Sequence, residues 1–229
     1  MPQMMSWLPE NISLEGIEID RLFYISYYLT AVTFILVAAA MLAFIIIYRQ
    51  KPGVRAKYTH GNSTLEILWT VIPAVILLVF ILVSQNSWAR LKFNPPAAPD
   101  VRVEVTAKQF NWIIRYPGPD GKFGTPDDKT LDNQLNVPVN KVVLITLKGE
   151  DVIHSFFIPQ ARMKQDVVPG RAIPLWFTLT KTGKFEIPCA ELCGFGHSGM
   201  KGEVVVHSPE SYQAWLQKTW APPQEAPRQ

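Results

Sequence analysis

Two cysteines, a histidine and a methionine stand close together near the C-terminal end of the sequence. They are Cys189, Cys193, His197 and Met200, which lie within a stretch of twelve residues. Thiolate and thioether ligands together favour copper over hard cations such as Mg²⁺, and imidazole binds copper equally well. The glycines between them let the backbone fold tightly enough for the side chains to converge. His154, which precedes a hydrophobic patch, adds a second imidazole, so the sequence predicts a copper site.

Three other sites could be built from the same residues. A disulfide between Cys189 and Cys193 would suit an oxidising outer compartment, but it gives no reason for His197 and Met200 to stand nearby. A zinc site would use both cysteines with His154 and His197, and would leave Met200 without a role. A single-copper blue site needs only one cysteine. Two cysteines suit two copper ions better, with each sulfur bridging both metals.

Two long apolar segments precede these residues. The first spans about residues 23–48 without a charge, and the second spans about residues 65–88 and contains Pro73, which a membrane helix tolerates. At about 1.5 Å per residue, each can cross a hydrocarbon core of about 30 Å. The alternatives are buried helices of a soluble protein and, for the first segment, a cleaved signal peptide, which would be shorter and would follow basic residues. We therefore expect a transmembrane helical hairpin over residues 23–93.

Charge is sorted along the chain as it is in membrane proteins. Residues 1–20 carry four acids and no lysine or arginine, whereas the loop over residues 49–60 carries four lysines and arginines and no acid. Loops rich in lysine and arginine stay in the cytoplasm. The N-terminal segment (residues 1–22), the C-terminus and the domain after the hairpin should then lie on the outer, periplasmic side of a bacterial inner membrane.

The overall charge excludes one class of partner. The chain has 22 basic and 19 acidic residues and a net charge of +3. Such a small excess of positive charge makes nucleic-acid binding unattractive, because that function relies on a strongly basic surface.

A small β domain is predicted over residues 101–207, after a proline-rich hinge at residues 94–100. Residues 101–105 alternate apolar and polar side chains, and residues 142–147 are rich in β-branched side chains. Glycine and proline interrupt such segments at short intervals. This pattern is typical of a small antiparallel sandwich or barrel.

Two segments of this outer region carry no metal chemistry. Residues 117–128 are rich in glycine, proline and aspartate, but they lack the EF-hand pattern, so we interpret them as a plain loop rather than a calcium site. Ser208 followed by Pro209 indicates a helix start. A C-terminal helix and tail are therefore expected over residues 208–229.

The string Cys-Ala-Glu-Leu-Cys-Gly-Phe-Gly-His-Ser-Gly-Met over residues 189–200 resembles the copper motif of cytochrome c oxidase subunit II. Residues 62–73 resemble the start of that family's second helix. Residues 151–156 resemble the segment with the upstream histidine, and residues 164–171 resemble the turn that follows it. The resemblance covers nearly the whole chain. It implies a two-helix transmembrane hairpin followed by an all-β, cupredoxin-like Greek-key barrel domain.

The resemblance also implies a dinuclear, mixed-valence copper centre called CuA. In that arrangement Cys189 and Cys193 bridge the two copper ions. The other implied ligands are His154 and Met200 on one copper, and His197 and the backbone carbonyl of Glu191 on the second. The side chain of Glu191 would reach a magnesium ion at the interface with the catalytic subunit.

A respiratory function without catalytic residues on this chain follows from the same resemblance. Electrons would pass from cytochrome c to CuA and then to haem in subunit I, where oxygen is reduced to water with coupled proton translocation. The implied partners are subunit I, subunit III, cytochrome c or a bound cytochrome c domain, and the lipid bilayer.

Two departures from the family concern the electron donor. A tryptophan usually takes the electron from cytochrome c, but here Phe110 holds that position and Trp112 follows it. Either ring could receive the electron, or both could be core aromatics. Asp166 fits a role in docking the donor, whereas Arg115 stands where many relatives have an acid. A cytochrome that is fused or permanently bound to a partner would need less electrostatic steering.

Glu66 lies at the cytoplasmic end of the second predicted helix. The matching glutamate in the family marks the entrance of a proton-uptake pathway. A capping box formed by Ser63 and Glu66 is an alternative that is compatible with that role.

Three other protein classes share some of these features. Quinol oxidases have a similar subunit without copper, and the intact ligand set argues against them. Nitrous oxide reductase shares the copper motif but is soluble and has a large second domain. A membrane-anchored copper-delivery protein is the non-enzyme alternative, and rapid metal exchange would distinguish it.

Overall fold

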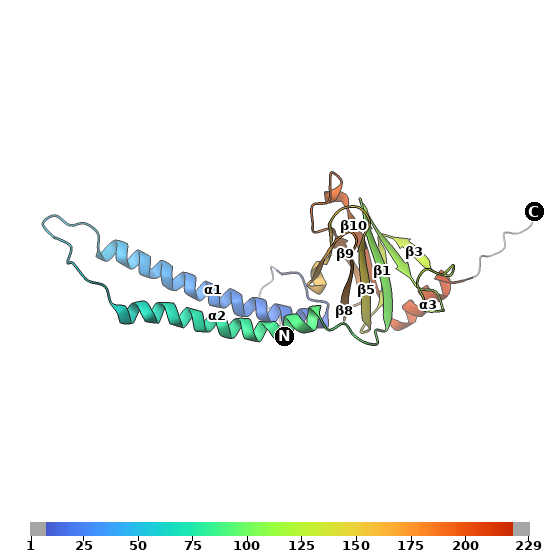
Figure 1. Ribbon diagram of the computed structural model, residues 1–229, viewed down its shortest axis with the longest axis horizontal. Helices are drawn as coiled ribbons and strands as arrows, with labels where there is room; N and C mark the ends of the chain where they lie inside the picture. The colour runs from blue at the N-terminus through green and yellow to red at the C-terminus, as the bar shows by residue number, and fades with distance from the viewer. Residues whose placement is uncertain (1–7, 222–229) are drawn as a thin grey trace, which may run out of the picture. The chain divides into compact units, whose positions relative to one another are not determined.

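The computed structural model describes residues 8–221. Residues 1–7 of the predicted N-terminal segment and residues 222–229 of the predicted tail lie outside the described residues. The chain divides into two compact units. One is Ile19–Ala89, with most of the two long helices, and the other joins Met1–Glu18 to Arg90–Gln229 and contains the β domain (Figure 1).

Two long helices, α1 (Leu14–Ile47) and α2 (Ser63–Lys92), run in opposite directions and are joined by residues 48–62 (Figure 1). Both are long and apolar enough to cross a membrane, and their most apolar windows are not buried within the protein. Hydroxyl groups within them donate hydrogen bonds to carbonyls one turn earlier, which removes free polar groups from a lipid environment. These hydroxyls belong to Ser26, Thr30, Thr33 and Thr70.

Side-chain caps set the start of both helices. Ser13 Oγ accepts a hydrogen bond of 2.9 Å from the amide three residues on, so α1 begins before its apolar segment. The Asn62 side chain accepts a hydrogen bond of 3.1 Å from the Leu65 amide at the start of α2. The predicted capping box of Ser63 and Glu66 is therefore wrong. The cap residue of α2 is Asn62, which lies one residue before Ser63.

Five strands form the largest sheet of the β domain, in the order β3-β2-β1-β5-β8. Alternate residues of β1 and β5 are buried, as a half-buried strand requires. β1 pairs antiparallel with β2 but parallel with β5. The strands span β1 (Val101–Lys108), β2 (Asn111–Tyr116), β3 (Lys129–Asp132), β5 (Val142–Gly149) and β8 (Ala172–Thr178).

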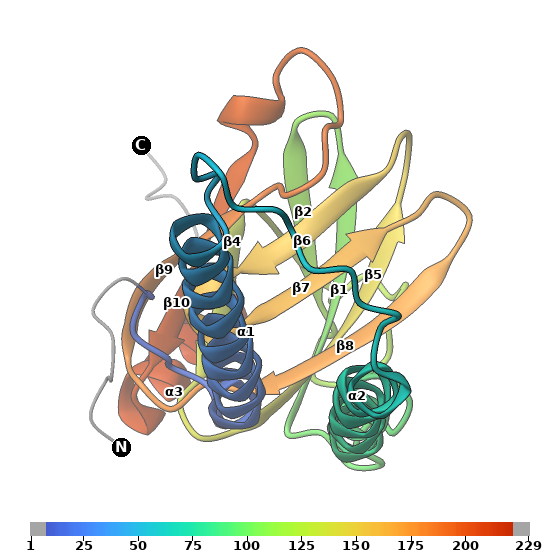
Figure 2. The ribbon, with the colours of Figure 1, turned by 90° about the vertical axis from the view of Figure 1, so that its left-hand side faces the viewer.

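Two smaller sheets complete the domain. β10 (Lys201–His207) lies between β4 (Gln134–Pro138), with which it is parallel, and β9 (Gly183–Pro188), with which it is antiparallel. β6 (His154–Ile158) and β7 (Met163–Val167) form an antiparallel pair that runs obliquely to β1 and β2 (Figure 2). A 3-10 helix, η1 (Pro159–Ala161), joins these two strands. The core between the sheets includes Trp112, Ile145, Phe156 and Phe177, all fully buried.

The predicted combination of two apolar helices and an all-β domain is confirmed, and the three sheets are compatible with the predicted cupredoxin-like fold. The expectation of a purely antiparallel arrangement is wrong, because β1–β5 and β10–β4 are parallel pairs. Period-two alternation shows which side chains a strand buries, but it does not show the direction of the strand's partner.

The last helix, α3 (Pro209–Thr219), packs through aromatic rings. Ser208 caps it by accepting a hydrogen bond from the Ser211 amide, at the position where the sequence indicated a helix start. The Trp215 ring lies 5.1 Å from that of Tyr116 on β2 and 5.4 Å from that of Tyr212. The contact with Tyr116 holds α3 against the β domain, and the contact between Tyr212 and Trp215 lies within the helix.

Candidate metal centre

Backbone hydrogen bonds bring together the segments that carry the predicted copper ligands. His154 is the first residue of β6, and Cys189 directly follows β9. The loop from β9 to β10 carries the other ligands and includes a second 3-10 helix, η2 (His197–Gly199). The Cys189 amide donates to the Met200 carbonyl (3.0 Å), which closes this loop, and Cys189 forms an isolated β-bridge with Phe156 of β6. The loop is therefore tied to the strand that carries His154.

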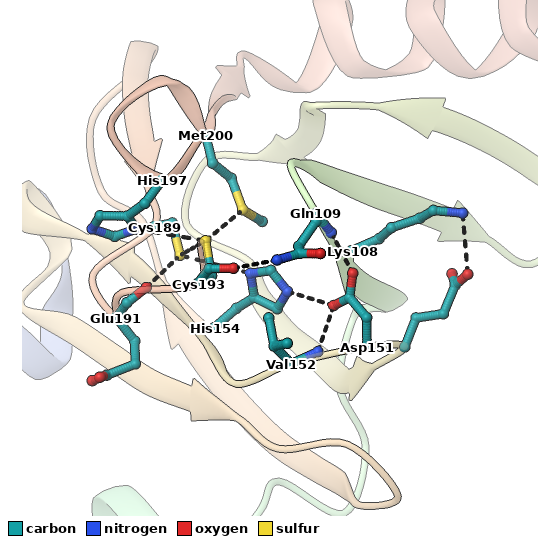
Figure 3. A network of polar contacts seen from close by, with 11 residues as sticks. Lys108, Gln109, Asp151, Val152, His154, Cys189, Glu191, Cys193, His197 and Met200 are labelled. Atoms are coloured by element: carbon teal, nitrogen blue, oxygen red, sulfur yellow. Dashed lines mark hydrogen bonds and ion pairs between the residues drawn. The ribbon is translucent and has the colours of Figure 1, made fainter. Parts of the chain in front are cut away.

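Two sulfur atoms form the middle of the cluster (Figure 3). The Sγ atoms of Cys189 and Cys193 are 3.8 Å apart. Each sulfur faces a histidine: Cys189 Sγ lies 3.9 Å from His154 Nδ1, and Cys193 Sγ lies 3.6 Å from His197 Nδ1. Two further donors lie near the sulfurs, Met200 Sδ at 3.8 Å from Cys193 Sγ and the Glu191 carbonyl oxygen at 3.3 Å from Cys189 Sγ.

The cluster is buried and its thiols are free. His154 is inaccessible to solvent, and Cys189 and Met200 are only 7% and 1% exposed. A disulfide needs a sulfur separation of about 2.05 Å, so Cys189 and Cys193 are not joined by a disulfide in this structure. Ligand atoms of His154, Cys189 and Cys193 all lie within 4.8 Å of one another, a spacing that a metal ion can fill. Together with a thioether and a carbonyl oxygen, this donor set fits copper.

The surroundings of Cys193 oppose the ionisation of its thiol. Burial, together with the neighbouring Cys189 thiol, raises the pKa of Cys193 to about 11. Thiolates are the metal-binding form of cysteine, so binding must release a proton here. The positive charge that stabilises the thiolate therefore has to come from the metal.

Asp151 orients the His154 ring from the side away from the sulfurs (Figure 3). Its Oδ1 lies 2.8 Å from His154 Nε2, and it also accepts hydrogen bonds from the amides of Gln109 (2.7 Å) and Val152 (2.7 Å). Burial opposes ionisation of Asp151, but these hydrogen bonds outweigh it and lower its pKa to about 2. With Nε2–H directed at the carboxylate, His154 Nδ1 is left free for a metal.

Phe110 covers the ligand loop. Its ring packs on Gly194 and Gly196, and a Cβ at Gly196 would lie 2.6 Å from the ring. The preceding residue, Gln109, donates from Nε2 to the Cys193 carbonyl (2.6 Å), and the peptide bond between Gln109 and Phe110 is cis. Phe110 is 39% exposed, so its ring connects the loop with the solvent-facing surface.

Trp112 occupies a different environment. It is fully buried, and its ring lies 6.2 Å from the His154 ring and 5.3 Å from the Phe156 ring. Trp112 is thus a core residue behind the metal-binding cluster, whereas Phe110 lies at the surface.

Three predicted site residues place their side chains outside the group of donors. Asp166 on β7 bonds to Lys164 Nζ (2.8 Å) and Ser155 Oγ (2.7 Å), and these two hydrogen bonds lower its pKa. The Glu191 carboxylate points away from the sulfurs, although its carbonyl faces them (Figure 3). Glu66 is exposed in the first turn of α2, which belongs to the other unit.

The sequence interpretation missed the residues that support the ligands. Gln109 and Asp151 hold Cys193 and His154 by hydrogen bonds, yet neither can bind a soft metal well. A weak signal existed for Asp151, since an acid three residues before a ligand histidine can reach its second nitrogen. Nothing in the sequence indicated the contact between Gln109 and Cys193.

Comparison with known proteins decides the family. The sequence model for the periplasmic domain of cytochrome c oxidase subunit II matches residues 103–208, and that for its transmembrane domain matches residues 9–86. Cytochrome c oxidase subunit 2 of Thermostichus vulcanus is 30% identical over 93% of this chain and 79% of its own length. The chain belongs to the cytochrome c oxidase subunit II family.

Two further subunit 2 sequences agree with this assignment. The alternative cytochrome c oxidase subunit 2 of Bradyrhizobium diazoefficiens is 31% identical over 89% of this chain and 81% of its own length. Cytochrome c oxidase subunit 2 of Cereibacter sphaeroides is 34% identical over 85% of this chain and 73% of its own length. A crystal structure of the periplasmic domain of subunit II from Bradyrhizobium japonicum is 33% identical over 55% of this chain and 96% of that one, with a TM-score of 0.49.

Membership of the subunit II family fixes the coarse function. The chain is a subunit of a haem-copper cytochrome c oxidase, an oxidoreductase complex, and works together with a subunit I. It is a membrane protein with a periplasmic, copper-binding domain.

Proposed function

We propose that this chain carries the dinuclear copper centre CuA, receives electrons from cytochrome c and passes them to haem in subunit I. There oxygen is reduced to water, coupled to proton translocation. The bound copper pair supplies one-electron redox chemistry. The chain supplies the ligands, a buried site and the hydrogen bonds that hold the ligands in place.

The observation that carries this proposal is that two free, buried thiols face each other and each has its own imidazole. Two metals that share both sulfurs would use all six donors of the cluster. Cys189 and Cys193 would hold the copper pair through their sulfurs. His154, His197, Met200 and the Glu191 carbonyl would supply the other ligands.

The same geometry disfavours the alternatives. A tetrahedral zinc ion would use four of the donors and leave buried sulfur or nitrogen atoms unused. A single blue copper would leave one buried thiol without a metal. A copper-delivery protein needs ligands from which the metal can leave readily, whereas His154 and Met200 are buried.

Phe110 is the better candidate for the position at which electrons arrive. It is partly exposed and packs on the backbone of the ligand loop, whereas Trp112 is fully buried. An electron donor at the protein surface can touch the ring of Phe110 but not that of Trp112.

Docking of the donor relies on apolar contact more than on charge. Asp166 is already paired with Lys164, and Arg115 lies within 4.0 Å of two carboxylates. Leu192 and Phe195 in the ligand loop are highly exposed. Since such contacts are insensitive to ionic screening, we expect electron transfer from the donor to depend weakly on salt concentration. A steep loss of rate with added salt would contradict this.

Further roles follow from the family. We propose that Glu66 is the entrance of a proton-uptake path, that the Glu191 carboxylate binds magnesium at the subunit I interface, and that subunit III belongs to the complex. Both termini would lie in the periplasm. Glu66→Gln should lower oxygen consumption in the assembled oxidase while electron transfer into the copper site stays unchanged. An unchanged rate of oxygen consumption would show that Glu66 does not belong to the proton-uptake path.

The proposal is tested by changing a bridging sulfur in the whole oxidase. Cys193→Ser should abolish rapid oxidation of ferrocytochrome c, while a small chemical reductant still reduces the haem of subunit I. Ser198→Ala, an exposed change in the same loop, is the control and should retain the rate. Wild-type oxidation of cytochrome c by the Cys193→Ser enzyme would contradict the proposal.

Phe110→Ala separates the two aromatic candidates. It should slow electron transfer from cytochrome c while the absorption spectrum of the copper site stays unchanged, because Phe110 binds no metal. If the rate of electron transfer from cytochrome c stays at the wild-type value, electrons enter the protein at a residue other than Phe110.

A further inference from the structure

The segment before α1 is built into the periplasmic domain. Chain contacts group residues up to Glu18 with that domain, although the family's transmembrane domain matches residues 9–86. Ile12 is fully buried and belongs to the core cluster of the β domain. Leu14 and Ile17, which follow closely, are 53% and 58% exposed. Burial is therefore specific to Ile12, as expected for a docked segment rather than for a simple linker.

Backbone hydrogen bonds hold this segment between two parts of the domain. The Ile12 amide donates to the Gln160 carbonyl of η1 (3.0 Å), and the Ile12 carbonyl accepts from the Thr180 amide (2.7 Å). Ser13 forms an antiparallel bridge with Leu179. The segment thus fills the space between η1 and the chain that follows β8.

Side-chain hydrogen bonds also tie this N-terminal segment to the domain, both at η1 and at the end of β8. Ser13 Oγ donates to the Ala161 carbonyl (2.7 Å), and Arg162 Nη2 donates to the Pro9 carbonyl (2.6 Å). A carboxylate oxygen of Glu15 accepts from the Thr178 amide (3.0 Å). The segment from Pro9 to Glu15 therefore bonds both to η1 and Arg162, which directly follow β6, and to the end of β8.

We propose that residues 9–15 form a clip that completes the periplasmic domain and fixes the end of β6. β6 starts at His154 and runs straight into η1, which the clip holds. A clip that detaches from η1 and Leu179 would expose apolar core and free the far end of the strand that carries a metal ligand. Its partner is thus the protein's own N-terminal segment, and a domain without that segment lacks a part of its core.

Amide hydrogen exchange on the metal-free, full-length chain in detergent tests the clip. In the wild type, the amides of Ile12 and Thr180 should exchange as slowly as those of the β-domain core. Ile12→Asp should accelerate amide exchange over residues 158–162 and 178–180 by about tenfold or more, because the core of the β domain loses a buried apolar side chain. Leu14→Asp is the matched control and should change exchange there little.

Two results would overturn the clip. One is an Ile12 amide in the wild type that exchanges as fast as the loop over residues 51–60, a result that needs no variant to fold. The other is equal exchange over residues 158–162 in Ile12→Asp and Leu14→Asp. Since no copper is present, neither result depends on the proposed electron-transfer function.

Discussion

Asp151 determines which nitrogen of His154 faces the sulfurs. It is held by two backbone amides and so presents a fixed oxygen to His154 Nε2. Hydrogen-bond partners of this kind fix the tautomer and orientation of ligand histidines.

Removing this carboxylate should weaken copper binding. Asp151→Ala is expected to lower copper affinity by about 10- to 100-fold, because the His154 ring loses its orientation. Titration of the full-length chain against a competing chelator measures this. Asp151→Asn should restore part of the affinity, since its amide oxygen can accept from Nε2–H. Glu150→Ala, which loses only an exposed ion pair with Lys108, is the control, and equal affinities for Asp151→Ala and this control would show that Asp151 does not position the ligand.

The sequence predicted the residues that donate to the metal, but not the residues whose hydrogen bonds hold those ligands in place. The donor types and their close spacing indicated the cluster, since most of it lies in one short loop. Gln109 and Cys193, however, are separated by 84 positions in the chain, and their contact depends on how the turn between β1 and β2 packs on the ligand loop. The choice between Phe110 and Trp112 also needed their burial, which the sequence around these two aromatic residues does not reveal.

Among the elements, α3 shows how a short helix is kept on the β domain. Its cap residue Ser208 satisfies an amide of the first turn, and its aromatic face meets Tyr116. A helix of this length is marginal in water without such support.

Ser208→Ala should destabilise the periplasmic domain by about 1 kcal/mol, because the Ser211 amide loses its acceptor. Denaturant unfolding of the full-length chain, followed by tryptophan fluorescence, measures the change. Ser198→Ala, which alters an exposed serine outside any cap, should leave the unfolding midpoint unchanged. Equal midpoints for the two variants would mean that the cap contributes nothing.

Elements were predictable where local signals were strong. The apolar lengths indicated both long helices, and Ser208 with Pro209 indicated the start of α3. The parallel pairing of β1 with β5 was not predictable, because β2 and β3 lie between them in the chain and alternation carries no direction. The cap at Asn62 was missed because Ser63 and Glu66 also match a capping pattern.

For the whole molecule, the charge of the loop over residues 49–60 predicts the orientation in the membrane. Its four lysines and arginines should keep it in the cytoplasm, with the copper-binding domain in the periplasm. Charge is informative here because it acts on the chain during insertion and does not depend on the final packing.

Cysteine labelling from each side of the membrane checks this orientation. Tyr58→Cys, in the basic loop, should react with an impermeant maleimide in everted vesicles but not in spheroplasts. Lys122→Cys, in the exposed loop of the β domain, should show the opposite pattern. Labelling of both positions from the same side would contradict a hairpin.

The division of the molecule was only partly visible in the sequence. Charge sorting and the proline-rich hinge indicated a membrane part and an outer part. The docking of Ile12 into the outer domain was not predictable, because Leu14 and Ile17 are equally apolar and only the packing shows that Ile12 is the buried one of the three.

We propose that six donors of this chain bind two copper ions as one centre. The copper content of the full-length chain and its electron paramagnetic resonance spectrum test this together. We expect two copper ions per chain and a hyperfine pattern from one electron shared by two equivalent nuclei. One copper ion with the pattern of a single nucleus, or zinc in its place, would contradict it.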